Sequence, residues 1–361
     1  MKSKMSTKFK DKILVLTYWS FSDALIQAYT LPYIQILSIN YNITLFCIDQ
    51  KQTRFMHFTK TEHNLNQHNS SSIDVISAKY YKNKLLMAVA WMLYIPILFF
   101  FIIFKKISFI HCWCTPAATF GNILSIFTSK PLVIDSFEPH ADAMVENGTW
   151  KKTSLIYRLL KFSEKWQSAR AGILFACTPN MNDYIIKNFR NDLSSKIIYK
   201  PACVDLNNFD YTRYDLAKIK LKYYKCDDIV CVYAGKFGGI YLEDEIFHFI
   251  SLAYKFWCNK FKFLLLSNAS SDYIVSKCNL HRIPYEIIDQ FFVPHDQMPL
   301  YLARADFALS PIMQVPSKKF CSPIKNSEYF AMGLPILISD GISIDSDIIK
   351  KKSFGYVMPE W

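Results

Sequence analysis

A polar loop near the end of the chain carries the residues best suited to do chemistry. It begins at Phe320, contains one cation, Lys325, and leads into a short predicted helix with the carboxylate Glu328, followed by a Gly-Leu-Pro stop and an apolar strand. In open α/β sheets, anions bind where such a loop enters a helix, because free backbone N–H groups and the helix dipole point at the ligand. Lys325 adds a charge for a phosphate, and Glu328 can accept hydrogen bonds from a ribose diol. The segment therefore predicts a nucleotide site.

A second segment, residues 235–239, has a complementary composition. Gly235, Lys236, Gly238 and Gly239 directly follow a predicted strand over 229–234. The glycines permit close backbone approach, and Lys236 projects at the carboxyl end of the sheet, where a cation stabilises a departing diphosphate. The alternative for this segment alone is a glycine-rich turn with a solvated lysine.

These residues resemble a known family. The run from Ser322 to Pro335 resembles the nucleotide-sugar loop of family 4 retaining glycosyltransferases, which have the GT-B fold. The resemblance implies that Glu328 holds the donor ribose and that Ser322, Ile324 and Lys325 belong to the diphosphate loop. It also matches Gly235-Lys236 to the family's Gly-Arg/Lys position, whose cation contacts the donor diphosphate. The family's usual earlier glutamate falls here on Phe320, as in a subgroup that writes the loop Ser-Pro-x-Lys.

Candidate catalytic residues occur in the first half of the chain as well. A predicted strand over 131–135 is followed by a segment rich in carboxylates, with His140 and Glu138. Such side chains could position an acceptor hydroxyl or share its proton. We expect His140 first and Glu138 second to act there, together with Lys236 at the diphosphate; helix capping and turn formation are the alternative roles.

The elements that must position these residues alternate between strands and helices. Short apolar strands are expected over 12–18, 43–48, 73–77, 107–112, 131–135 and 172–177, and again over 229–234, 261–267, 285–289, 306–310 and 335–339. This order is typical of parallel doubly wound sheets. We predict an α/β protein of GT-B type, in which two Rossmann-like domains, 1–205 and 206–361, face a cleft. The family usually continues further, which leaves open whether the second domain is short or C-terminally incomplete.

An apolar stretch over residues 85–104 contains no charge and has lysines on both sides. Its length is sufficient for a transmembrane helix. Three features oppose a span: it falls between two strands of one predicted sheet, it contains Pro96, and both of its ends are basic. We expect a first-domain helix that lies in the membrane interface. A buried core helix and a true span remain alternatives.

The composition narrows the choice of partners. The 361 residues carry a formal net charge of +12, which suits an anionic partner. Nucleic acid is not expected, because no dense basic run is interleaved with aromatic residues. The ten cysteines are scattered; their one close pair, Cys112 and Cys114 beside His111, is interpreted as core residues, and Asp345-Ser346-Asp347 as a solvated turn. No metal or cofactor is expected, since lysines and helix N-termini can neutralise a diphosphate.

These observations lead to one expected function. The chain is expected to move a sugar from a nucleotide diphosphate sugar to a lipid-linked or glycan acceptor. Its location would be cytoplasmic, as a peripheral or monotopic protein on the inner face of the cell membrane. Retention of anomeric configuration and the acceptor class are implied by the resemblance alone. The alternatives are an inverting transferase or sugar-nucleotide epimerase of GT-B fold, a catalytically weak scaffold subunit, and an integral membrane protein.

Overall fold

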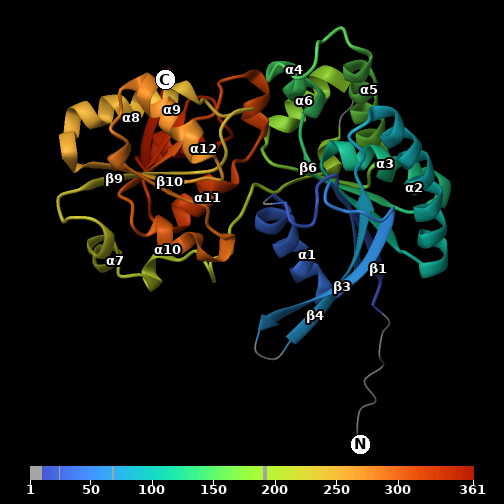
Figure 1. Cartoon of the computed structure of the whole chain (residues 1–361). Helices are drawn as coiled ribbons and strands as arrows, with labels where there is room; N and C mark the ends of the chain where they lie inside the picture. Colours follow the sequence, from blue (N-terminus) through green and yellow to red (C-terminus); the bar gives the residue numbers. More distant parts are fainter. Residues whose placement is uncertain (1–9, 24, 67–68, 190–192) are drawn as a thin grey trace, which may run out of the picture. The chain divides into compact units, whose positions relative to one another are not determined.

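The chain folds into two compact units. The computed structural model describes residues 10–23, 25–66, 69–189 and 193–361 (Figure 1). The first unit comprises Met1–Asp142 and Trp150–Lys200, and the second comprises Ala143–Thr149 and Pro201–Trp361. Each unit has its own sheet, so each can be described by itself.

The first unit contains an eight-stranded sheet in the order β3-β4-β2-β1-β5-β6-β7-β8. Its strands are β1 Lys12–Leu16, β2 Asn42–Asp49, β3 Met56–Asn66, β4 Asn69–Lys79, β5 Phe109–Trp113, β6 Leu132–Phe137, β7 Ile173–Ala176 and β8 Ile197–Tyr199. Strand β1 pairs in parallel with both β2 and β5. The central strands are buried on both faces, which explains why they appear in the sequence as continuous apolar runs.

Strand β3 departs from the predicted parallel sheet. It pairs antiparallel with β4 and forms the edge of the sheet. Polar residues such as His57 and Lys60 alternate with few apolar ones, and Phe58 is 60% exposed. An edge strand needs no continuous apolar run, so the apolar pattern used for the other strands could not find it.

Helices complete the first unit: α1 Leu31–Ser38, α2 Lys84–Lys105, α3 Cys114–Thr128, α5 Leu155–Arg170 and α6 Asn180–Phe189. Helix α4 His140–Glu146 begins in the first unit, and its residues from Ala143 on belong to the second. Helix α3 packs against both α2 and α5 (Figure 1). Among the described helices, one segment, Leu85–Lys105, is long and apolar enough to cross a membrane by length and composition. Strand β2, earlier in the chain, and strand β5, directly after the helix, both pair with β1, and β4, directly before the helix, pairs with β2.

The second unit contains a six-stranded parallel sheet in the order β11-β10-β9-β12-β13-β14. Its strands are β9 Ile229–Ala234, β10 Phe261–Leu266, β11 Ile288–Phe291, β12 Phe307–Ser310, β13 Ile336–Ser339 and β14 Gly355–Met358. This is the Rossmann strand order. The first three strands extend the sheet toward one edge, and the fourth pairs with the other side of the first and extends the sheet toward the opposite edge. That switch point lies here between β9 and β12.

The core of the second unit lies on both faces of this sheet. Val230 and Val232 of β9 join one apolar cluster, while Cys231 and Tyr233 join the other. The covering helices are α7 Leu216–Tyr223, α8 Asp244–Trp257, α9 Ser271–His281, α10 Met298–Leu302, α11 Ile324–Ala331 and α12 Asp345–Lys352. The prediction of two α/β domains with parallel sheets is confirmed.

Candidate functional site

The switch point of the second sheet brings the two predicted donor segments together. Gly235 directly follows β9, and the loop before α11 follows the neighbouring strand β12. A Cβ atom placed on Gly235 would lie 2.8 Å from Nζ of Lys325. Gly235 also has a φ of 148°, a conformation that side-chain-bearing residues rarely adopt. This glycine therefore leaves room for the Lys325 ammonium group.

Lys325 is buried, with 8% of its surface exposed. Its Nζ lies 4.3 Å from the ring centroid of Tyr233 and 3.9 Å from that of Tyr241. Among the described residues it has no hydrogen-bond partner. Burial lowers the pKa of Lys325 to about 7, although the Glu328 carboxylate opposes this shift. A buried ammonium without a hydrogen-bond acceptor is costly, and a bound anion would supply the missing partner.

The N-terminus of α11 also presents hydrogen-bond donors that have no side-chain acceptor. Pro323 precedes the helix and offers no capping side chain, so the first backbone N–H groups, beginning at Ile324, have no side-chain acceptor. The Ser322 hydroxyl instead accepts a hydrogen bond from the backbone N–H of Ala202 at 2.9 Å. Ser327 donates to the carbonyl of Ala202 at 2.7 Å. Ser322 thus stabilises the turn at Ala202. Contact of Ser322 and Ile324 with a diphosphate stays a prediction.

Glu328 lies one turn further along α11 and is 6% exposed. Its Oε1 lies 2.8 Å from Nε2 of His295, whose ring lies 5.2 Å from that of Phe209. His295 thereby orients one oxygen of Glu328, which leaves the other oxygen for a ligand. Only its place after β11, at the carboxyl edge of the sheet, could have indicated this.

The turn after β9 contains Lys236, Gly238 and Gly239. Lys236 is exposed, and its backbone carbonyl accepts a hydrogen bond from the Tyr233 hydroxyl at 2.7 Å. Gly238 and Gly239 have φ values of 78° and 70°, in the left-handed region that favours glycine. These angles explain the glycine pair. Contact of Lys236 with a donor diphosphate, and its part in catalysis, stay predictions.

The two acceptor-side candidates lie in the first unit, after β6. His140 begins α4, and its backbone N–H donates to the carbonyl of Glu138 at 2.8 Å. That carbonyl also accepts from Thr115 Oγ1 at 3.2 Å. These hydrogen bonds therefore stabilise the backbone that leads into α4. The catalytic roles of the His140 and Glu138 side chains stay predictions.

A buried charged cluster in the first unit was not anticipated from the sequence. Asp135, at the carboxyl half of β6, accepts from Lys200 and lies 3.2 Å from Nε2 of His111. Lys200 Nζ also lies 3.9 Å from the ring centroid of Tyr33 and 4.5 Å from that of Trp113. Burial alone would raise the pKa of Asp135, but His111 and Lys200 lower it. The cluster draws on α1, β5, β6 and Lys200, which are far apart in the sequence, so no local motif predicts it.

Two predictions on metal ligation can be compared with the structure. Cys112 and Cys114 are buried free thiols, as expected of core residues. Asp345 does not lie in a solvated turn, because it begins α12 and accepts a hydrogen bond from Asn326 at 2.8 Å. Across the part of the chain that the structure describes, no three His, Cys, Asp or Glu side chains group as metal ligands.

The sequence matches no protein-family model and no curated protein. The fold, however, is similar to those of solved glycosyltransferase-type structures. Sucrose-phosphate synthase from Thermosynechococcus elongatus superposes with a TM-score of 0.70 at 11% identity, over 97% of this chain and 86% of the other. WaaG, a glycosyltransferase involved in lipopolysaccharide biosynthesis, gives 0.69 at 11% identity, over 96% and 85%. Anabaena Alr3699/HepE, in complex with UDP-glucose, gives 0.65 at 13% identity, also over 96% and 85%. The predicted GT-B fold is thereby confirmed.

Proposed function

We propose that the chain is a glycosyltransferase that takes a sugar from a nucleotide diphosphate sugar bound in the second unit. The observation that carries the proposal is the buried ammonium of Lys325. It lies at the topological switch point, beside Gly235, and has no acceptor among the described residues. Ligands of Rossmann-like sheets bind at this point. A diphosphate is the anion whose charge and size suit a lysine next to a helix N-terminus.

The arrangement supports the chemistry of sugar transfer. Breaking the bond to the sugar places negative charge on the departing diphosphate, which fixed positive groups stabilise. Lys325, the backbone N–H groups at the start of α11 and the exposed Lys236 would supply them. Glu328, oriented by His295, would accept hydrogen bonds from the ribose hydroxyls. His140 or Glu138 of the first unit would position the acceptor hydroxyl.

Several similar structures support this donor class. HepE was solved with UDP and glucose and with UDP-glucose, and an Escherichia coli protein, described as trehalose-6-phosphate, was solved with UDP-2-fluoro glucose. WaaG acts in lipopolysaccharide biosynthesis, which supports a lipid-linked or glycan acceptor. Retention of anomeric configuration is part of the proposal on the strength of the family 4 resemblance.

We also propose a peripheral or monotopic position on the cytoplasmic face of the cell membrane, through α2. Leu85, Met92, Phe100 and Phe104 of this helix are each 55–78% exposed. A row of apolar side chains between basic ends suits an anionic membrane interface. The pairing of both β2 and β5 with β1 favours this position over a transmembrane span, because one sheet cannot lie on both sides of a bilayer.

A scaffold subunit with little turnover is the second candidate. Phe320 stands where the family usually has a carboxylate, and only 5% of its surface is exposed. Calorimetric titration with UDP, GDP and ADP, followed by an assay for release of UDP from UDP-sugars, separates the candidates. The enzyme binds one nucleotide and turns over its sugar conjugate, whereas a scaffold binds without turnover. An epimerase would return an altered nucleotide sugar. If the folded protein bound no nucleotide, the proposal would fail.

A further inference from the structure

Helix α5 is amphipathic, but its apolar face points outward and its polar face points into the protein. Leu155, Leu159 and Phe162, spaced at i, i+4 and i+7, lie on one face and are 59–70% exposed. Trp166, one further turn along, is 43% exposed. The face turned into the protein is polar instead: Ser163, Glu164, Gln167 and Ser168 are buried. In a water-soluble domain the apolar face of a surface helix packs inward. The outward apolar face of α5 therefore requires an occupant other than water.

The inner polar face is held by specific contacts, so α5 cannot simply be turned around. Ser163 Oγ lies 2.9 Å from Oγ1 of Thr119 on α3. Glu164 Oε1 accepts from the backbone N–H of Ala141 at 2.8 Å, at the start of α4. These contacts bind α5 to two neighbouring helices through its polar residues. Its apolar residues consequently stay on the outside.

The charges on α5 indicate what covers this face. The helix contains one acidic residue, the buried Glu164, whereas Arg158, Lys161, Lys165 and Arg170 are all basic. Arg158 and Lys165 are exposed, and Lys161 is paired with Asp142 at 2.6 Å. An apolar stripe with cations beside it and no exposed acid on the same helix is typical of segments that lie in the interface of an anionic membrane.

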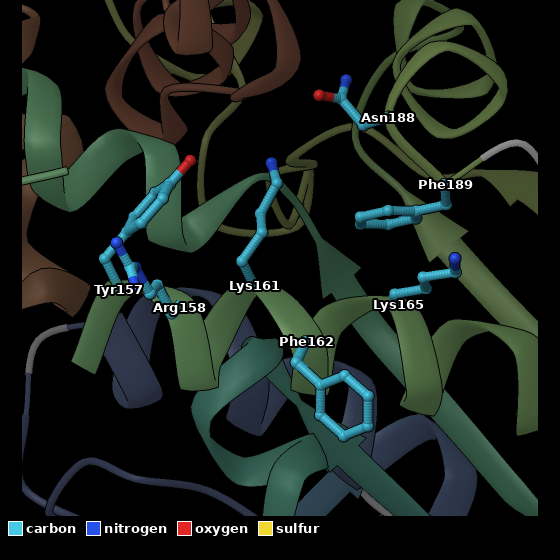
Figure 2. A pocket seen from close by; sticks show the side chains of 7 residues that line it. All are labelled: Tyr157, Arg158, Lys161, Phe162, Lys165, Asn188 and Phe189. Atoms are coloured by element: carbon cyan, nitrogen blue, oxygen red, sulfur yellow. The ribbon is translucent and has the colours of Figure 1, made fainter. Parts of the chain in front are cut away.

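A pocket of about 310 Å³ lies on the basic side of the stripe, between α5 and α6. Its lining includes Arg158, Lys161, Lys165 and Phe189. In Figure 2 the ring of Phe162 points away from the side chain of Lys161, although both residues line the pocket. The apolar stripe thus directly borders the basic groups, as in a helix that inserts beside charged lipid head groups.

Helix α3 packs against both α5 and α2, and its Phe127 is 69% exposed. Three neighbouring helices of the first unit therefore expose large apolar side chains. A bilayer can cover apolar side chains on several helices, whereas one partner helix would cover a single stripe.

We propose that α5 is a second membrane-binding surface, in which Leu159, Phe162 and Trp166 enter the acyl layer while Arg158 and Lys165 contact lipid phosphates. The proposal adds a contact to the one at α2 and does not depend on donor binding.

Flotation of the purified full chain with lipid vesicles tests this proposal. Vesicles of phosphatidylcholine with phosphatidylglycerol are compared with vesicles of phosphatidylcholine alone. The double variant Leu159→Glu with Phe162→Glu is expected to bind the anionic vesicles at least about tenfold more weakly. Phe256→Glu on α8, whose phenylalanine is 78% exposed, is the matched control and should bind as the wild type does. Equal binding by the double variant would overturn the proposal.

Further measurements separate the remaining explanations. The double variant must retain the wild-type circular dichroism spectrum and nucleotide affinity; if it misfolds, Trp166→Phe replaces it. Acyl-brominated lipids should then quench wild-type fluorescence more than that of Trp166→Phe, and equal quenching would overturn the proposal. Arg158→Glu with Lys165→Glu should reduce the preference for anionic vesicles, with the lysines at the ends of α2 accounting for the part that remains; an unchanged preference would overturn the phosphate contacts of α5. If light scattering showed instead a dimer that the double variant disrupts, with no vesicle binding, a second copy would be the occupant and the proposal would be wrong.

Discussion

Replacement of Lys325 by methionine should stabilise the protein while removing nucleotide binding. The gap between the usual lysine pKa of 10.5 and the value of about 7 corresponds to about 5 kcal/mol, at roughly 1.4 kcal/mol for each pKa unit. The rings of Tyr233 and Tyr241 offset part of this penalty, since a cation–π contact contributes about 0.5–2 kcal/mol. Lys325→Met is therefore expected to raise the free energy of unfolding by about 2–4 kcal/mol at pH 6.

The pH dependence of this gain follows from the direction of the pKa change. Below pH 7, Lys325 is charged in both the folded and the unfolded chain, so the wild type carries the full penalty of burying the charge. Between pH 7 and the usual lysine pKa, the unfolded chain binds more protons than the folded one, so the wild type becomes more stable as pH rises. The advantage of Lys325→Met should therefore be about 1–3 kcal/mol smaller at pH 9 than at pH 6.

Urea denaturation of the two proteins at pH 6 and pH 9, each with and without UDP, measures both effects. At about a hundred times its Kd, UDP should stabilise the wild type by roughly 2.7 kcal/mol. It should leave Lys325→Met unchanged. The exposed Lys350, replaced by methionine, is the matched control. A stability difference that does not change with pH, or equal stabilisation of both proteins by UDP, would refute the account of a buried lysine kept for an anion.

Three other predictions concern the site and the first unit. Glu328→Ala should weaken nucleotide binding by roughly 1.5–3 kcal/mol, and His295→Ala by less, as measured by calorimetry; identical affinities would remove the ribose assignment. Gly235→Ala should weaken nucleotide binding because its Cβ would displace the Lys325 ammonium group and strain the backbone, whereas Gly172→Ala in the first unit, with its nearest neighbour at 3.8 Å, should retain it. Burial raises the pKa of Glu164 to about 8. The wild type therefore loses stability as pH rises from 4.5 to 8, because the unfolded chain ionises this carboxyl group before the folded chain does. Glu164→Gln should therefore be more stable than the wild type at pH 8.5 but not at pH 4.5 in urea denaturation.

The sequence predicted most of the fold because buried parallel strands leave a local record. Strands such as β9 and β13 are continuous apolar runs bounded by glycine, proline or polar residues, and their positions were predicted within a residue or two. Strand β3 was not found, because an edge strand is stabilised by backbone pairing and needs no apolar run. The outward orientation of the apolar face of α5 was likewise not predicted, since periodicity shows that a helix has two faces but not which face points inward.

The site was predictable where one short segment carries the chemistry. Lys325 and Glu328 belong to a single loop and helix, and Gly235 follows the first strand of its sheet. The partners of these residues were not predictable. His295 reaches Glu328 across 33 positions of the sequence, and Tyr241 closes over Lys325 from another segment. Such contacts depend on strand order, which no local pattern specifies.

The most direct test of the account is calorimetric titration of the wild type and Lys325→Met with UDP, GDP and ADP at pH 6.5. The account predicts that one nucleoside diphosphate binds the wild type with a defined stoichiometry and that Lys325→Met loses this binding while remaining folded. If the variant bound the same nucleotide with unchanged affinity, the buried lysine would not be the diphosphate partner, and the assignment of the donor site would be wrong.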